Sequence, residues 1–242
     1  MTALDTADRV LFLHAHPDDE TLATGTLIAD LVARGVEVGV VTATRGERGE
    51  TRVTSADLIA LRERELSAAL GILGVHRHGF LGQPPARSAG LPPRRYTDSG
   101  MVWLTETLAG AAPESGPDAL TAADPAEAAA DLAGYAEWFG AQALVSYDAA
   151  GGYGHPDHVA CHRIGRRAAA LAGTAWFEIV SDPSADPGAV DLARYRDTVV
   201  AALEQYRSQL QVDGDEVVHV GGQRQPVPTL VAVREVPPGR RP

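Results

Sequence analysis

The stretch His14-Ala15-His16-Pro17-Asp18-Asp19-Glu20 lies between a short apolar run and a segment with helical periodicity. Residues 10–13 are all apolar, which indicates a buried strand, and residues 21–34 carry apolar side chains at helical spacing. The polar stretch is therefore expected at the carboxyl end of a strand, just before a helix begins. Ligands of open α/β sheets bind at this edge, and imidazoles with carboxylates gathered there are typical of a metal site.

The same alternation of strand and helix continues along the chain. Further strands are predicted at 37–42, 76–81, 143–147 and 175–180, and further helices at 56–73, 125–140, 155–172 and 192–210. Ordered βαβα alternation predicts an α/β fold, a Rossmann-like and mostly parallel sheet with helices on both faces. We expect one domain over residues 1–242, with a core at about 9–180 and a C-terminal helix and short edge strands within 190–236.

Three segments are predicted to be irregular. Residues 44–54 form a polar loop, residues 82–100 are rich in turn residues and are expected to form a surface loop, and residues 109–124 are interpreted as a connector. A long loop in a compact domain is usually functional.

Composition restricts the partners of the protein. The chain has 242 residues, 45% of them hydrophobic and 22% charged, and a net charge of −11, which argues against nucleic-acid binding. The single cysteine, Cys161, excludes an internal disulfide and suits a reducing compartment. No signal peptide or membrane-spanning run is recognised. These features predict a cytoplasmic protein that acts on a small molecule, away from membranes, and they leave open whether it forms a homo-oligomer.

A second polar stretch repeats the setting of the first. Gly151-Gly152-Tyr153-Gly154-His155-Pro156-Asp157-His158 follows the strand predicted at 143–147 and opens the next helix. Two His-Pro-Asp turns at the ends of two strands can converge above the sheet, where a catalytic zinc needs three N or O ligands and one open position. His16, Asp19 and His158 would supply that set and would leave Asp18 and His155 for proton transfer. Two His and one carboxylate also suit Fe²⁺, and either turn alone could be only a helix N-cap.

These two motifs resemble those of the zinc-dependent N-deacetylases related to PIG-L and LmbE proteins. The glycine-rich second motif is most similar to the actinobacterial branch that deacetylates N-acetylglucosaminyl-inositol in mycothiol synthesis, and residues 44–50, 62–66 and 98–101 also fit that branch. The likeness covers residues 9–165 and returns weakly at 201–209, where Tyr206 stands in place of the usual histidine.

The resemblance implies a role for each matching residue. His16, Asp19 and His158 would be the zinc ligands, and Asp18 would be the general base that takes a proton from the zinc-bound water. His155 would act as electrophile or general acid, and Tyr153 would help to hold the oxyanion. Asp157 would orient an imidazole.

The chemistry that follows is hydrolysis of an N-acetyl group. Zinc lowers the pKa of a bound water to about 7 and polarises a carbonyl group, so an acetamide on an N-acetylglucosamine-type conjugate would give acetate and a free amine. Arg62, Asp98 and Glu47 are candidate contacts to the sugar hydroxyls. A natural-product intermediate as substrate, a mycothiol-conjugate amidase and a silent sugar-binding homologue remain as alternatives. A nucleotide-binding Rossmann protein is excluded because the first turn lacks G-x-G-x-x-G.

Overall fold

The computed structural model describes residues 2–51 and 57–237, and its main element is a six-stranded sheet. The strand order is β13-β7-β6-β1-β2-β3, in which β13 alone is antiparallel to its neighbour. The strands are β1 (Arg9–His14), β2 (Glu37–Thr42), β3 (Arg77–Phe80), β6 (Ala143–Tyr147), β7 (Ala175–Ile179) and β13 (Val233–Glu235). The predicted α/β fold with a mostly parallel sheet is confirmed.

The connections between strands reverse direction at β1. From β1 the chain builds β2 and then β3 on one side, and it returns to add β6 and β7 on the other side. β1 therefore pairs in parallel with both β2 and β6. The carboxyl ends of β1 and β6 flank this switch point, which is where open α/β sheets bind ligands.

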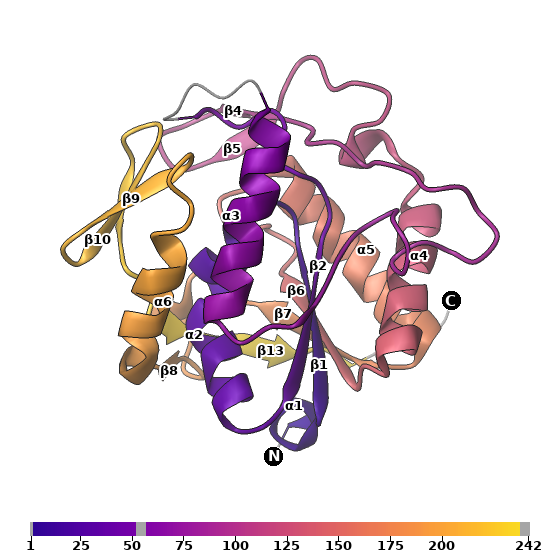
Figure 1. Cartoon of the computed structure of the whole chain (residues 1–242), viewed down its shortest axis with the longest axis horizontal. Coiled ribbons are helices and arrows are strands. Elements are labelled where there is room, and N and C mark those ends of the chain that lie inside the picture. The colour runs from indigo at the N-terminus through magenta and orange to yellow at the C-terminus, as the bar shows by residue number, and fades with distance from the viewer. Residues whose placement is uncertain (1, 52–56, 238–242) are drawn as a thin grey trace.

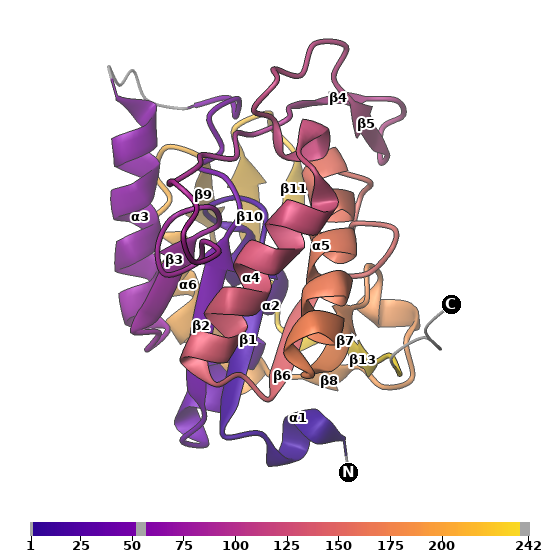
Figure 2. The ribbon, with the colours of Figure 1, turned by 90° about the vertical axis from the view of Figure 1, so that its right-hand side faces the viewer.

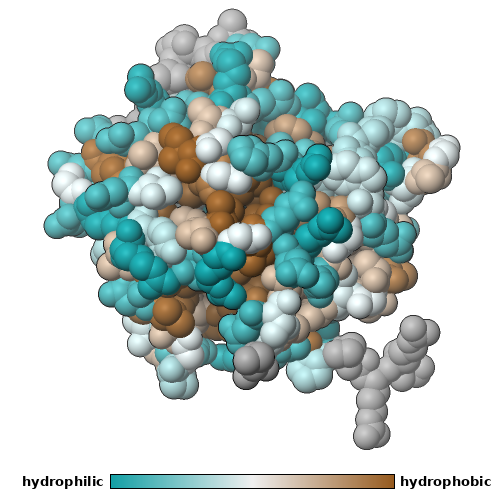
Figure 3. Space-filling view, turned by 60° about the horizontal axis from the view of Figure 1, so that its bottom comes forward, coloured by the Kyte–Doolittle hydropathy of each residue, from teal (hydrophilic) through white to brown (hydrophobic). Residues whose placement is uncertain are grey.

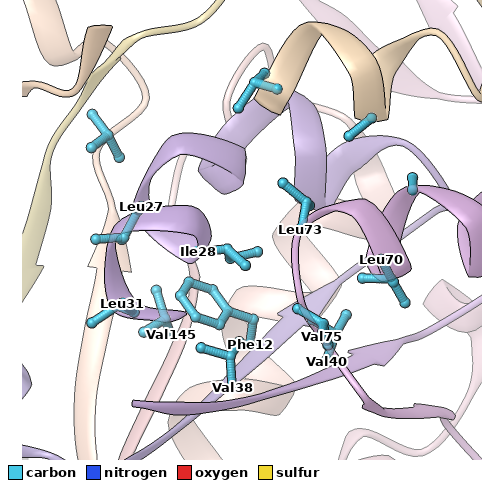
Figure 4. Close-up of a cluster of buried hydrophobic side chains, with 14 of the residues drawn as sticks. Phe12, Leu27, Ile28, Leu31, Val38, Val40, Leu70, Leu73, Val75 and Val145 are labelled. Atoms are coloured by element: carbon cyan, nitrogen blue, oxygen red, sulfur yellow. The ribbon is translucent and has the colours of Figure 1, made fainter. Parts of the chain in front are cut away.

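Helices cover both faces of the sheet (Figures 1 and 2). One face carries α2 (Asp19–Ala33), α3 (Leu58–Ile72) and α6 (Arg196–Leu203), and the other carries α4 (Pro125–Phe139) and α5 (Pro156–Ala172). Alternate residues of β1 divide between the two cores, because successive strand side chains point to opposite faces. Phe12 packs with Ile28 and Leu70 in the first core (Figure 4), and Leu11 belongs to the second.

The ends of the outer helices follow the sequence closely. Asp124 caps α4 by accepting a hydrogen bond from the backbone N–H of Ala126, and Gly140 ends that helix in a left-handed conformation. The helix predicted at 155–172 is α5. The helix predicted at 56–73 is α3, which begins at Leu58; residues 52–56, which include the end of the predicted polar loop, lie outside the described residues.

The helix predicted at 192–210 is wrong beyond Leu203. A short 3₁₀ turn, η3 (Ala193–Tyr195), precedes α6, and the chain then turns into a separate sheet of β9 (Leu210–Asp213), β10 (Glu216–His219) and β11 (Arg224–Pro226). The helix ends early because Tyr206 is fully buried and because the backbone N–H of Ser208 donates to Glu65 at 2.8 Å. Tertiary contacts thus override an amphipathic pattern.

Two irregular segments also differ from prediction. The loop at 82–100 is not confined to the surface, since Tyr96 is fully buried and donates to Asp131 at 2.9 Å. The connector at 109–124 contains β5 (Ala109–Ala111), which pairs with β4 (Met101–Trp103), and a turn η1 (Leu120–Ala122). The small remaining elements are α1 (Ala3–Thr6), η2 (Pro183–Ala185), and the pair β8 (Val190–Asp191) and β12 (Leu230–Val231).

The face at the amino ends of the strands is mainly hydrophilic around a central apolar hollow (Figure 3). None of the described helices combines the length and the apolar character needed to cross a membrane.

Candidate metal centre

The turn after β1 is strained at Asp18. This residue has φ 107°, the one positive φ at a non-glycine position among the described residues. Such a conformation persists only where surrounding contacts enforce it, and it is often found at functional sites. Next to it, Asp19 opens α2, and its Oδ2 accepts a hydrogen bond from the backbone N–H of His16 at 2.9 Å. The turn therefore holds the His16 and Asp19 side chains together.

The turn after β6 relies on glycines instead. Gly151 has φ 65°, and a Cβ there would lie 2.8 Å from Cγ2 of Val159, so glycine is required. The carbonyl oxygen of Gly151 lies 3.2 Å from Nδ1 of His158. This contact assigns the ring proton of His158 to Nδ1 and leaves the Nε2 lone pair free to bind a metal.

Asp19 connects the two turns. Its Oδ2 lies 3.2 Å from Nδ1 of His16 and 3.3 Å from Nε2 of His158. Nε2 of His158 is buried and has no hydrogen-bond partner within the described chain. A buried nitrogen lone pair beside a carboxylate and a second imidazole fits a metal ion. The predicted convergence of His16, Asp19 and His158 is present in the structure.

Two other sets of ligand atoms lie within 4.8 Å of one another, His16 with His155 and His158, and His16 with Asp98 and Asp157. Asp19 also accepts a backbone N–H, from His16, so backbone hydrogen bonds do not separate the three sets; His16 is common to all of them and His158 to two. Burial disfavours charge on His16, yet Asp98, Asp157 and Asp19 outweigh it and hold the pKa of His16 well above its usual value. The cluster therefore attracts a cation.

Both carboxylate oxygens of Asp157 are engaged in hydrogen bonds. Its Oδ2 lies 3.2 Å from Nε2 of His16 and accepts the backbone N–H of Ser99 at 2.9 Å, and its Oδ1 accepts the Ser99 hydroxyl at 2.5 Å. Burial raises the pKa of a carboxyl group, but the bonds from His16 and Ser99 prevail and lower the pKa of Asp157. Asp157 therefore fixes the His16 ring with Nδ1 turned toward Asp19.

His155 is held as a neutral imidazole. Its Nδ1 accepts the backbone N–H of Asp157 at 3.1 Å, and its ring centroid lies 4.6 Å from that of His16 and 4.9 Å from that of His158. Burial and these two imidazoles lower the pKa of His155 to about 2. Because Nδ1 accepts, the proton of the neutral ring is assigned to Nε2, which can donate to a substrate oxygen.

Asp18 has the opposite electrostatic setting from Asp157. Burial raises the pKa of Asp18 to about 8, supported by Asp19 and Glu20 and opposed by Arg62. Nη2 of Arg62 lies 3.2 Å from Oδ2 of Asp18. A metal ion beside Asp18 would favour its charged form and lower this pKa again, so the carboxyl group can exchange a proton near neutral pH.

Arg62, predicted to contact sugar hydroxyls, is buried and hydrogen-bonded within the chain. Nη1 donates to the carbonyl oxygen of Gly46 and Nη2 to that of Pro17, both at 2.7 Å. A Cβ at Gly46 would overlap the guanidinium group. This geometry favours a different role, in which Arg62 holds Asp18 and the loop after β2.

The two other predicted substrate contacts lie beside the cluster. Asp98 accepts backbone N–H groups from Arg48 at 3.2 Å and Gly100 at 2.7 Å, so both of its oxygens are engaged. Glu47 uses Oε2 to accept the N–H of Asp98 at 3.0 Å, and its buried Oε1 has no hydrogen-bond partner within the described chain. Glu47 therefore has one carboxylate oxygen without a partner among the described residues, whereas both oxygens of Asp98 are engaged.

Sequence reasoning missed two supporting contacts. Ser99 holds Asp157, whereas its sequence segment indicates only a fit to a family branch. Glu20 is fully buried, accepts the Tyr206 hydroxyl at 2.5 Å and accepts the backbone N–H of Asp18 at 3.2 Å. The aromatic residue at 206 therefore supports the strained Asp18 turn, a signal that the sequence showed only as a departure from the family pattern.

Tyr153, predicted to stabilise an oxyanion, stands at the mouth of the cluster. Its ring centroid lies 5.4 Å from that of His158 and 6.0 Å from that of His155, and the residue is 42% exposed. Its ring also stacks on Trp103. Tyr153 is thus positioned between the imidazoles and solvent.

The open α/β sheet and the histidine and carboxylate cluster at its switch point define the class, an α/β protein with a candidate metal centre. The chain belongs to the PIG-L family, since the family model described as GlcNAc-PI de-N-acetylase matches residues 11–169. The predicted family is confirmed.

Two curated relatives carry the same name, 1D-myo-inositol 2-acetamido-2-deoxy-alpha-D-glucopyranoside deacetylase. The protein from Kineococcus radiotolerans is 43% identical over 175 residues, which cover 70% of this chain and 46% of that protein. The protein from Mycolicibacterium vanbaalenii is 36% identical over 251 residues, covering 86% and 82%. The chain spans about half the length of the first relatives that it matches.

Among solved structures, N,N'-diacetylchitobiose deacetylase from Pyrococcus horikoshii superposes with a TM-score of 0.61 at 19% identity, over 85% of this chain and 72% of that one. At this identity the likeness supports the fold alone.

Proposed function

We propose that this protein is a zinc-dependent N-deacetylase that hydrolyses the acetamide of an N-acetylglucosamine-type sugar conjugate and releases acetate and a free amine. The observation that carries the proposal is Asp19 Oδ2 lying 3.2 Å from Nδ1 of His16 and 3.3 Å from the buried Nε2 of His158, which makes no hydrogen bond within the described chain, with Asp18 next to Asp19 in the turn. The names of the curated relatives support the sugar class.

His16, Asp19 and His158 would hold the metal ion. When bound, zinc supplies Lewis acidity, which polarises the acetamide carbonyl and acidifies a water molecule. Fe²⁺ suits the same ligands, and metal analysis distinguishes the two. His16 would bind through Nδ1, because Nε2 faces Asp157, and His158 would bind through Nε2, because Nδ1 faces the carbonyl oxygen of Gly151.

The remaining residues account for the proton transfers. Asp18 takes a proton from the attacking water as its oxygen adds to the carbonyl carbon, and Arg62 keeps the carboxylate in place. Nε2–H of His155 donates to the developing oxyanion, and the hydroxyl of Tyr153 helps from the mouth of the site. The C–N bond then breaks, and Asp18 returns its proton to the leaving nitrogen, which yields acetate and an amine.

The partner is proposed to be a small amino sugar and the location the cytoplasm, as the composition predicts. N-acetylglucosaminyl-inositol is the first substrate to test, because it is the compound in the relatives' name. A glycosylated natural-product intermediate is the second, since Tyr206 departs from the pattern of the mycothiol branch.

The decisive experiment measures acetate release by the purified protein. The panel contains N-acetylglucosaminyl-inositol, methyl N-acetylglucosaminide, free N-acetylglucosamine and glycosylated natural-product scaffolds, each with metal, with chelator, and with zinc or Fe²⁺ restored after chelation. Turnover that disappears with chelator and returns with metal supports the proposal. Metal-loaded protein that binds these sugars but releases no acetate would establish the silent sugar-binding homologue instead.

A further inference from the structure

Large apolar side chains are exposed together beside the metal centre. Trp103 is 44% exposed, Leu104 63%, Leu108 46% and Tyr153 42%. These four residues, from the β4–β5 hairpin and the loop before α5, are named here the aromatic rim. Clustered exposed apolar residues mark binding surfaces more often than isolated ones do.

The rim is held rigidly against the candidate centre. The backbone N–H of Ala109 donates to the carbonyl oxygen of Tyr153 at 2.8 Å, which ties β5 to the loop that carries His155. A Cβ at Gly154 would lie 2.8 Å from Cδ1 of Leu108, so glycine allows the hairpin to pack closely here. Figure 2 shows the hairpin above the end of α5 at which His155 lies.

The aromatic rings form a continuous path outward from the centre. Tyr153 contacts the rings of His158 and His155, and its other neighbour is Trp103, at 5.6 Å between centroids with 28° between planes. Trp103 is thus two ring contacts from the imidazole that would bind the metal. Trp103 is the solvent-exposed end of this path.

Trp103 also lines a shallow, open depression with Leu104, Thr105, Glu106 and Gln223. Gln223 belongs to the turn before β11, so two hairpins distant in sequence form the walls. The lining combines two apolar side chains, one carboxylate and no basic group, which disfavours an anionic occupant.

We propose that the aromatic rim binds the aglycone of the sugar substrate, and that this aglycone presents a flat apolar or aromatic surface to Trp103. This inference rests on the proposed deacetylase function, because that function fixes which part of the substrate lies at the metal. A ring-shaped aglycone can lay its C–H face on the exposed indole, and an aromatic one extends the stack already formed by Tyr153 and Trp103, so an aromatic aglycone should make the strongest contact.

The test compares N-acetylglucosaminides that differ only in the aglycone. Methyl, octyl and 2-naphthyl glycosides are assayed for acetate release by the metal-loaded protein, by Trp103→Ala and by Trp138→Ala. Trp138 is a matched control, because it is 56% exposed and lies on α4. We expect the naphthyl glycoside to have a KM about 10-fold below that of the methyl glycoside, from the added stacking.

In Trp103→Ala the naphthyl-to-methyl ratio of KM should approach one, and Trp138→Ala should keep the original ratio. Equal KM values for all three glycosides in the unaltered protein overturn the proposal, as does an equal effect of the two substitutions. An octyl glycoside that matches the naphthyl one overturns the stacked aromatic contact. A Trp103→Ala protein that changes oligomeric state in sedimentation, with the KM ratio unchanged, assigns the rim to self-association instead.

A binding measurement separates failure of the proposed function from failure of this inference. If no glycoside releases acetate, the deacetylase proposal fails, and calorimetric titration of the same three glycosides still reports the rim. If the naphthyl glycoside binds more tightly than the others, and Trp103→Ala removes this difference, the aglycone subsite is supported even without turnover. Equal affinities for the three glycosides overturn the subsite.

Discussion

The two His-Pro-Asp turns have the same three residues at the same place in the fold, yet their aspartates differ. Asp18 has a raised pKa, a strained backbone and Arg62 as its side-chain partner. Asp157 has a lowered pKa, no backbone strain of that kind, and hydrogen bonds from His16 and Ser99. A carboxylate whose two oxygens are both held by hydrogen bonds orients its neighbours, whereas one that can gain or lose a proton can take part in chemistry.

The backbone explains part of this difference. The second turn places its positive φ angles on Gly151, Gly152 and Gly154, so Asp157 itself lies in the first turn of α5. The first turn has no glycine, and the strain falls on Asp18, whose side chain is thereby directed toward Arg62. A repeated motif therefore predicts where a site lies, but the turn geometry decides which aspartate acts.

Asp18→Asn should give the largest effect. The substitution keeps the size of the side chain and removes the group that accepts the proton, so kcat should fall about 10²- to 10⁴-fold. Zinc content per chain should remain that of the unaltered protein, because Asp18 is not among the proposed ligands. Steady-state acetate release with metal analysis checks this, and full activity in the metal-loaded variant would remove Asp18 from the mechanism.

Asp157→Asn should weaken metal binding rather than proton transfer. Loss of the charge beside His16 should weaken metal affinity about 10- to 100-fold, as is typical when the partner of a ligating histidine is changed. Excess metal should restore much of the activity, which it cannot do for Asp18→Asn. Metal titration followed by the assay makes the comparison, and two variants that respond alike to metal would show that the turns do not divide their roles.

The sequence predicted the convergence of the two turns because each motif follows an apolar strand, and parallel strands bring their carboxyl ends to one edge. It could not predict the function of Arg62, which depends on its contacts with the carbonyl oxygens of Pro17 and Gly46. The hydrophobic periodicity also could not predict that α6 ends at Leu203, because that end depends on contacts of Ser208 and Tyr206 with residues distant in sequence. Local patterns predict elements, and long-range polar contacts decide their ends.

Tyr206→Phe tests whether the strained turn at Asp18 depends on a hydrogen bond from a residue distant in sequence. The change removes the hydroxyl that donates to the buried Glu20, whose other oxygen holds the Asp18 backbone. The Thr21 hydroxyl still donates to the same Glu20 oxygen, so the free energy of unfolding should fall by about 0.5–1.5 kcal/mol, the usual net contribution of one hydrogen bond. In addition kcat should fall by less than in Asp18→Asn, with metal affinity unchanged.

Tyr195→Phe is the control for Tyr206→Phe, because its hydroxyl also donates to a carboxylate, Asp30, at 3.2 Å, but away from Asp18. Denaturant unfolding and kcat are measured for both variants. Equal losses of kcat in the two would mean that the Tyr206 hydroxyl does not act through the Asp18 turn.

His78→Gln should have the smallest effect on activity. It tests how much of the protein's loss of stability in acid comes from a histidine outside the two turns. Burial, and then Arg45, lower the pKa of His78 to about 4, and its Nε2 contacts the Thr42 hydroxyl at 3.1 Å. The unfolded chain, with a pKa near 6.5, therefore binds this proton more readily than the folded one. The stabilisation from neutral His78 is present above about pH 6.5 and is lost as the pH falls toward 4.

The unaltered protein should consequently lose on the order of 2 kcal/mol more stability than His78→Gln between pH 7 and pH 4. Denaturant unfolding of both proteins across this range checks the difference. The substitution should leave the pH profile of kcat in place, because His78 lies on β3 and makes no contact with the metal cluster among its hydrogen bonds and ring contacts. Parallel stability curves would show that His78 titrates alike in both states, and acid sensitivity of folding would then come from other groups, such as the buried His14, whose pKa burial also lowers to about 4.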